Sequence, residues 1–128
     1  MATLDDVARV AARLPEATEG ERHGTRAWSV AGKVFAWERQ FSKADIKRYG
    51  DAPVPPGPIV AAAVADLGEK EAVLAAGKAG IFTIPHFDGY AAVLIELDEV
   101  ERATLEETVL DAWLAKAPAR LTEAYRAG

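Results

Sequence analysis

The stretch RAWSVAGKVFAWER, residues 26–39, predicts a β-hairpin. Aromatic and β-branched residues, which favour strands, flank Gly32, and glycine supplies the positive φ that a tight turn requires. Strict alternation along the second strand would divide its side chains between two faces, with Lys33, Phe35, Trp37, Arg39 and Phe41 on one and Val34, Ala36 and Glu38 on the other. The hairpin indicates that the fold contains an antiparallel sheet.

The sequence before the hairpin predicts a helix. Thr3 and Asp6 form a capping-box pattern, apolar residues then recur at helical spacing as far as Leu14, and Asp5 can pair with Arg9 four residues later. A short strand is expected over residues 18–23. The hairpin therefore has a helix and a strand before it.

The sequence after the hairpin predicts more strands and helices. Strands are expected over residues 59–65, 81–84 and 90–97, and helices over 66–76 and 104–117, the latter opened by a capping box from Thr104 to Glu107. Strands arranged in hairpins with helices between them predict an α+β fold with a mainly antiparallel sheet and helices packed on it. The expected core comprises Phe82, Val93, Leu94, Ile95, Val109, Leu110 and Trp113.

Length and composition limit the class of protein. With 128 residues the chain is expected to form a single domain over 1–128, in which the proline-rich residues 50–58 are a surface loop. The absence of cysteine excludes disulfide scaffolds, cysteine-bound metals and thiol catalysis. No apolar run approaches the roughly 20 residues that a membrane span needs, so we expect a cytoplasmic protein that does not insert into membranes.

The charge is distributed unevenly along the chain. The net charge is −5, but residues 1–50 hold nine basic against seven acidic side chains, and residues 51–128 hold six against thirteen. Nucleic-acid binders owe much of their affinity to cations that neutralise phosphates. A nucleic-acid surface would therefore have to be a local basic patch in the first half of the chain.

Several short motifs occur together in a recognisable order. These are His23-Gly24, Ala27-Trp28, Gly32-Lys33-Val34-Phe35-Ala36, Pro85-His86-Phe87-Asp88-Gly89-Tyr90 and Ala112-Trp113. Their order and intervals resemble the MmcQ/YjbR family over nearly the whole length. The resemblance implies a compact α+β fold similar to CyaY and frataxin, and a non-enzymatic DNA-binding protein.

The DNA-binding hypothesis rests on basic side chains in and after the hairpin. The candidate phosphate contacts are Arg22, Arg26, Lys33, Arg39, Lys43, Lys47 and Arg48, interleaved with Trp28, Phe35 and Trp37, whose rings could stack on bases. The alternative is that the aromatic residues pack in the core while the cations are merely solvated.

A second hypothesis is a small-molecule or metal site. It would comprise His23, Trp28, His86 and Asp88, because imidazole titrates near neutrality and a carboxylate can fix its tautomer. The alternative is that these side chains bond to their own turns. No nucleophile elbow, phosphate loop or paired-histidine motif is present, so the sequence predicts neither a cofactor nor a catalytic site.

A third hypothesis is a protein-interaction module. Pro53-Val54-Pro55-Pro56 could adopt polyproline II and dock on an aromatic groove, or could simply stiffen a loop. A face carrying Phe35, Trp37 and Phe41 would instead suggest a homodimer.

Overall fold

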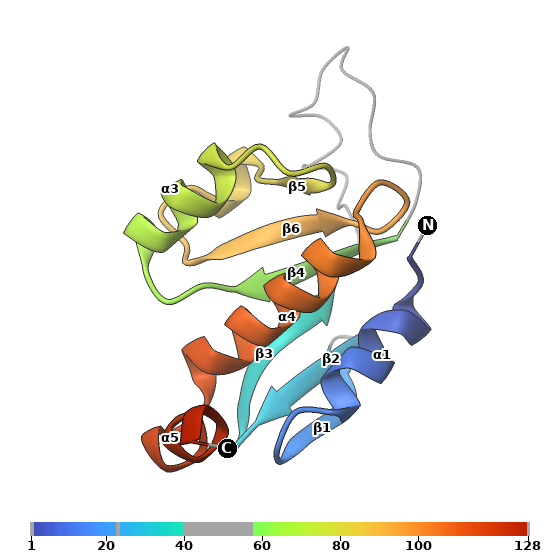
Figure 1. Ribbon diagram of the computed structural model, residues 1–128. Coiled ribbons are helices and arrows are strands. Elements are labelled where there is room, and N and C mark those ends of the chain that lie inside the picture. The colour runs from blue at the N-terminus through green and yellow to red at the C-terminus, as the bar shows by residue number, and fades with distance from the viewer. Residues whose placement is uncertain (1, 23, 40–57, 128) are drawn as a thin grey trace.

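The fold is an α+β arrangement, as the sequence predicts. The computed structural model describes residues 2–22, 24–39 and 58–127, and of His86 only the backbone. The elements follow one another as α1 (Leu4–Ala12), β1 (Ala17–Arg22), β2 (Thr25–Val30), β3 (Lys33–Glu38), β4 (Ile59–Ala63), α3 (Leu67–Ala75), β5 (Ile81–Phe82), the 3-10 turn η1 (Pro85–Phe87), β6 (Ala92–Glu96), α4 (Arg102–Lys116) and α5 (Ala119–Ala127). The strands form one antiparallel sheet in the order β1-β2-β3-β4-β6-β5 (Figure 1).

The first helix begins as its sequence predicts. The Thr3 hydroxyl accepts a hydrogen bond from the Asp6 amide, and the Asp6 carboxylate accepts one from the Thr3 amide, which completes the capping box. The predicted pair between Asp5 and Arg9 is wrong. Arg9 pairs with Asp6, and Asp5 reaches across to Arg26 on the sheet.

The long helix begins earlier than its sequence pattern predicts. The capping box from Thr104 to Glu107 does not form, because α4 starts at Arg102 with Glu101 as its N-cap residue and no side-chain cap. Arginine and alanine at 102 and 103 are good helix formers, so the helix extends upstream of the threonine. Thr104 is instead buried within the first turn.

The hairpin β2–β3 forms as predicted, with one irregularity. Ala31 and Gly32 both have positive φ, at 51° and 80°, and Val30 pairs with Lys33, as in a two-residue turn whose twist matches the strands. The register then shifts, because Trp28 pairs with Ala36 whereas Ser29 pairs with Val34. Phe35 is therefore an extra residue, a β-bulge.

The bulge changes which face Phe35 occupies. Strict alternation would place Phe35 beside Trp37, but Phe35 is fully buried in the main core and Trp37 packs on the other side of the sheet. The predicted face that joined Phe35 to Trp37 is therefore wrong, because a bulge re-aims the side chain at the extra position. Phe41, the third member of that face, lies outside the described residues.

The main core lies between the sheet and the helices α1 and α4, both in front of the sheet in Figure 1. Of the seven predicted core residues, five are fully buried, and Leu110 and Phe82 are partly buried. Leu94 belongs to a smaller cluster on the opposite side. We call that opposite side, away from α1 and α4, the open face.

The open face is covered in part by the segment between β5 and β6. Ile84 and Phe87 from this segment pack against Ile59, Ala61 and Leu94 of the sheet. Within the described parts of the chain, no helix is long and apolar enough to cross a bilayer.

Candidate nucleic-acid interface

Three aromatic rings gather on the open face. Trp37 comes from β3, whereas Phe87 and Tyr90 belong to the segment between β5 and β6. The ring centroids of Trp37 and Tyr90 are 6.2 Å apart with planes inclined by 49°, and those of Phe87 and Tyr90 are 5.5 Å apart in an edge-to-face arrangement at 73°. Such tilted and edge-to-face contacts are the favoured geometries for aromatic pairs.

The sheet register gives the Trp37 ring its place. Trp37 pairs with Ala27 on one side and with Ala61 on the other, and Ala27 in turn pairs with Gly20. Directly paired residues of antiparallel strands point to the same side, so the indole lies among small neighbours. These neighbours leave room for the ring on the open face and leave it only partly covered.

Two arginines lie against these rings. The guanidinium carbon of Arg22 is 5.3 Å from the centroid of Trp37, and that of Arg39 is 5.5 Å from the centroid of Phe87. The Arg39 amide also donates to the carbonyl of Ile59 at 2.8 Å. This bond continues the pairing of β3 with β4 by one residue beyond the end of β3. Cation–π contacts orient a guanidinium while leaving its charge in place.

A buried lysine fixes the aromatic segment. Lys70 of α3 is 7% exposed, and its Nζ donates to the carbonyls of Phe87 at 2.6 Å and Tyr90 at 2.8 Å. Burial lowers the pKa of Lys70, and the charge of Asp88 opposes that shift. These two bonds tie the segment that carries both rings to a helix.

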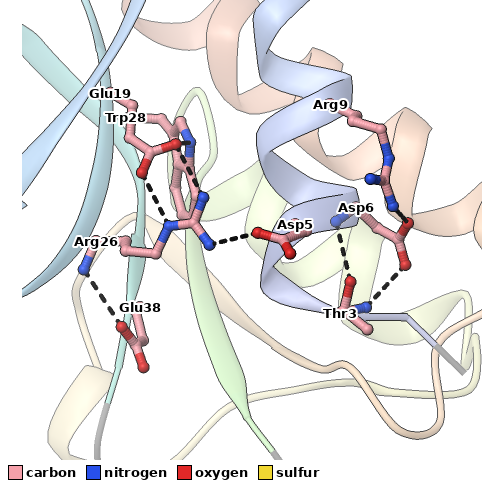
Figure 2. Close-up of polar contacts among 8 residues, drawn as sticks. All are labelled: Thr3, Asp5, Asp6, Arg9, Glu19, Arg26, Trp28 and Glu38. Carbon is pink, nitrogen blue, oxygen red and sulfur yellow. Dashed lines mark hydrogen bonds and ion pairs between the residues drawn. The ribbon is translucent and has the colours of Figure 1, made fainter.

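Arg26 serves a structural role on the other side of the sheet (Figure 2). Its guanidinium donates to both carboxylate oxygens of Glu19, at 2.9 and 3.0 Å, and to Asp5 at 3.0 Å. Glu19 also accepts from the indole of Trp28, at 3.1 Å, and the Arg26 amide donates to Glu38. The hydrogen bond from Arg26 holds the pKa of Glu19 below its usual range. The predicted phosphate contact Arg26 is thus paired within the molecule.

Two predicted stacking rings and one predicted cation also lie away from the aromatic patch. Trp28 is 1% exposed and Phe35 is fully buried, so the alternative that these rings pack in the core is confirmed. Lys33 is exposed at the turn between β2 and β3, whereas Arg22 ends β1 and pairs with Thr25 at the opposite end of β2. The length of β2 separates the two cations by about 17 Å along the strands.

The remaining predicted site residues are placed only in part. His23, Lys43, Lys47, Arg48 and the proline motif at 53–56 lie outside the described residues. Asp88 is exposed after η1, and the backbone of His86 lies within η1. Among the side chains that the structure describes, no group of three histidine, aspartate or glutamate residues could hold a metal. A site that joins both histidines stays a prediction.

Sequence reasoning missed the partners that complete the aromatic patch. Tyr90 and Phe87 lie within the motif Pro85–Tyr90, but alternation suggested a strand residue for Tyr90 rather than a ring beside Trp37. Lys70 gave no signal, because a single lysine in a charged helix is usually solvated.

Comparison with known proteins identifies the family. The family model described as YjbR matches residues 12–115. Proteins named uncharacterized protein Mb2600, from Mycobacterium bovis, and uncharacterized protein Rv2570, from Mycobacterium tuberculosis, are each 45% identical to the chain over 130 residues, which cover 99% of this chain and 98% of each relative. No solved structure gives a significant match. On this match and on these relatives, the chain belongs to the YjbR family.

Proposed function

We propose that this protein binds DNA without catalysing a reaction on it, and that the open face makes the contact. The observation that supports the proposal is the convergence of Arg22 and Arg39 on one patch of aromatic surface. Guanidinium groups donate several N–H bonds in a fixed fork that suits phosphate oxygens. The resemblance to the MmcQ/YjbR family points to the same ligand.

The groove between α3 and α4, on the helical side of the sheet, is an unfavourable place for a phosphate. This groove has a volume of about 230 Å³, and its lining includes two acidic side chains, Glu69 and Asp111, and one basic side chain, Arg126. Burial raises the pKa of Asp111, and the neighbouring charges of Glu107 and Glu69 raise it further. The negative charges of Glu69, Glu107 and Asp111 therefore disfavour a phosphate at this position of the groove.

The chemistry of the patch suits binding rather than catalysis. Its members are arginines, which keep their proton at every physiological pH, and aromatic rings, which offer flat apolar surface. Such groups position phosphates and bases. We therefore propose a binding protein in which Arg22 and Arg39 contact the DNA backbone, and Lys33 lies outside the main contact.

The test is a titration of fluorescein-labelled DNA that has a duplex region and a single-stranded tail, followed by anisotropy at several salt concentrations. We expect an affinity that falls with salt. Each lost phosphate contact flattens the slope of log K against log salt by about 0.7–0.9, so an Arg22→Gln/Arg39→Gln variant should flatten it by about 1.4–1.8.

A control is Arg126→Gln on α5, which makes half of this charge change at an exposed position elsewhere on the molecule. It should bind like the wild type. No binding at about 50 mM salt, or equal slopes for the wild type and the double variant, would contradict the proposal.

A further inference from the structure

We infer that the DNA bound at the open face is single-stranded, and that its bases stack on Trp37 and Tyr90. This inference rests on the proposed function. Duplex DNA presents phosphates and groove edges but hides the faces of its bases, whereas single strands expose them to aromatic side chains.

Two aromatic rings of the open face are accessible to solvent. Tyr90 is 48% exposed although it is a large aromatic residue, and Trp37 is partly exposed beside it. Phe87 is 4% exposed and packs its ring against Tyr90. The patch therefore consists of one buried ring, Phe87, that supports two accessible rings, Trp37 and Tyr90. Such an arrangement is typical of a stacking platform.

The inclination of the rings determines how many bases they can take. The planes of Trp37 and Tyr90 meet at 49°, so one flat base cannot lie parallel to both. Each ring therefore offers a separate stacking surface, and successive nucleotides would occupy them. The guanidinium carbon of Arg22 lies 5.3 Å from the centroid of Trp37, so a nucleotide at this ring would also meet the cation.

The charge balance supports stacking as the main source of affinity. In a molecule of net charge −5, two arginines provide a modest electrostatic attraction for DNA. Stacking on an aromatic side chain contributes about 1–3 kcal/mol per base. The arginines then align the backbone, while the rings provide most of the binding free energy.

The rings are also held in place before any ligand arrives. Lys70 donates to the carbonyls of both Phe87 and Tyr90, and the register of β3 with its neighbours fixes Trp37. Because the backbone that carries the rings is already ordered, little backbone freedom is lost on binding, which favours affinity.

The experiment compares three labelled probes of equal length, namely oligothymidylate, its fully abasic counterpart and a blunt duplex. The abasic strand keeps the phosphates and removes the stacking surface. We expect oligothymidylate to bind tighter than either. Tyr90→Leu should weaken its binding about 5- to 150-fold and leave binding of the abasic strand unchanged.

Two variants make the comparison specific. Tyr90→Phe keeps the ring, so its loss of affinity for oligothymidylate should be smaller than that of Tyr90→Leu. Tyr125→Leu removes a comparably exposed tyrosine, 41% exposed, on α5, and should bind like the wild type. Quenching of Trp37 fluorescence by oligothymidylate provides a readout in the wild type that does not depend on how a variant folds.

The outcomes separate the inference from the function on which it rests. Equal binding of abasic and thymidine strands, or tighter binding of the duplex, would overturn the stacking inference and leave DNA binding intact. Binding to none of the three probes at low salt would overturn the proposed function. A dimer that buries Trp37, detected by light scattering and loss of quenching, would also overturn the inference.

Discussion

At the scale of single residues, Asp6 connects three parts of the molecule. Its carboxylate caps α1 through the Thr3 amide, accepts a hydrogen bond from Arg9, and lies 3.5 Å from the guanidinium of Arg102 on α4. The hydrogen bond from Arg9 is the main reason that the pKa of Asp6 is lowered from 3.8 to about 2. The charged form is therefore favoured in the folded protein.

This shift predicts a pH-dependent contribution to stability. Because the folded pKa lies below the unfolded one, the contribution is fully present above about pH 4 and is lost as the pH falls towards about 2. We expect the difference in unfolding free energy between the wild type and Asp6→Asn to shrink over that range. Urea titrations at a series of pH values would measure it.

The control for this titration is Glu71→Gln, which makes the same charge change at an exposed position on α3. It should follow the wild type across the range. If wild type and Asp6→Asn lose stability in parallel as the acidity rises, Asp6 does not make this contribution.

Arg22 and Arg26 are close in sequence but contact opposite sides of the sheet. The sequence predicts both as phosphate contacts. Arg22 is the last residue of β1, and Arg26 lies in β2. Arg26 faces α1 and pairs with Glu19 and Asp5, whereas Arg22 lies over Trp37 on the open face. The register of β1 and β2 places Arg26 on the side of the sheet that α1 covers, where carboxylates are within reach. It places Arg22 on the side that α1 does not cover.

At the scale of elements, Gly80 determines how β5 enters the sheet. Its φ is +84°, and its carbonyl accepts a hydrogen bond from the Glu96 amide at 2.7 Å. A Cβ atom at this position would lie 2.7 Å from the Val100 nitrogen and 2.9 Å from the Glu96 carbonyl oxygen. Backbone atoms of Glu96, at the end of β6, and of Val100, shortly after it, therefore leave no space for a side chain at residue 80.

Replacement of Gly80 by alanine should be costly. We expect Gly80→Ala to lower the free energy of unfolding by about 2–5 kcal/mol, because a left-handed backbone conformation and close packing both oppose the methyl group. Gly77 is the matched control. Its φ is +64° but a Cβ atom there meets nothing within 4 Å.

Gly77→Ala should therefore cost about 1–2 kcal/mol, from the backbone conformation alone. Chemical denaturation of the two variants side by side measures the difference. Equal losses would mean that the close approach of residues 80, 96 and 100 does not constrain the fold.

At the scale of the whole molecule, the sheet has two unequal sides. Helices α1 and α4 cover one side, where Trp28 and Trp113 are 1% and 0% exposed, and Trp113 donates to the Pro15 carbonyl at 3.0 Å. The open face carries Trp37, which is partly exposed. Two of the three tryptophans therefore report on the covered side of the sheet and one on the open face.

This asymmetry can be measured by quenching. We expect acrylamide to quench the fluorescence of Trp37 in the folded protein and to leave that of Trp28 and Trp113 almost unaffected, because the quencher must contact the ring. Trp37→Phe should remove the accessible fraction. Substantial quenching that persists in this variant would show that the helical side is not closed as described.

Local sequence patterns are sufficient to predict most of the helices and strands and the class of fold. Local chemistry was sufficient there. The apolar spacing after Thr3 and the positive φ required at Gly32 each act over a few residues, so they can be read without knowledge of the tertiary structure. The motifs also indicated the family.

The tertiary structure alone decided which side chains share a surface. The bulge at Phe35 places that ring in the core. Folding of the chain brings Tyr90 beside Trp37, although the two residues are about fifty positions apart in the sequence. Alternation along a strand assumes an unbroken ladder, and a bulge breaks it. Contacts between distant segments depend on register and packing, which local sequence does not encode.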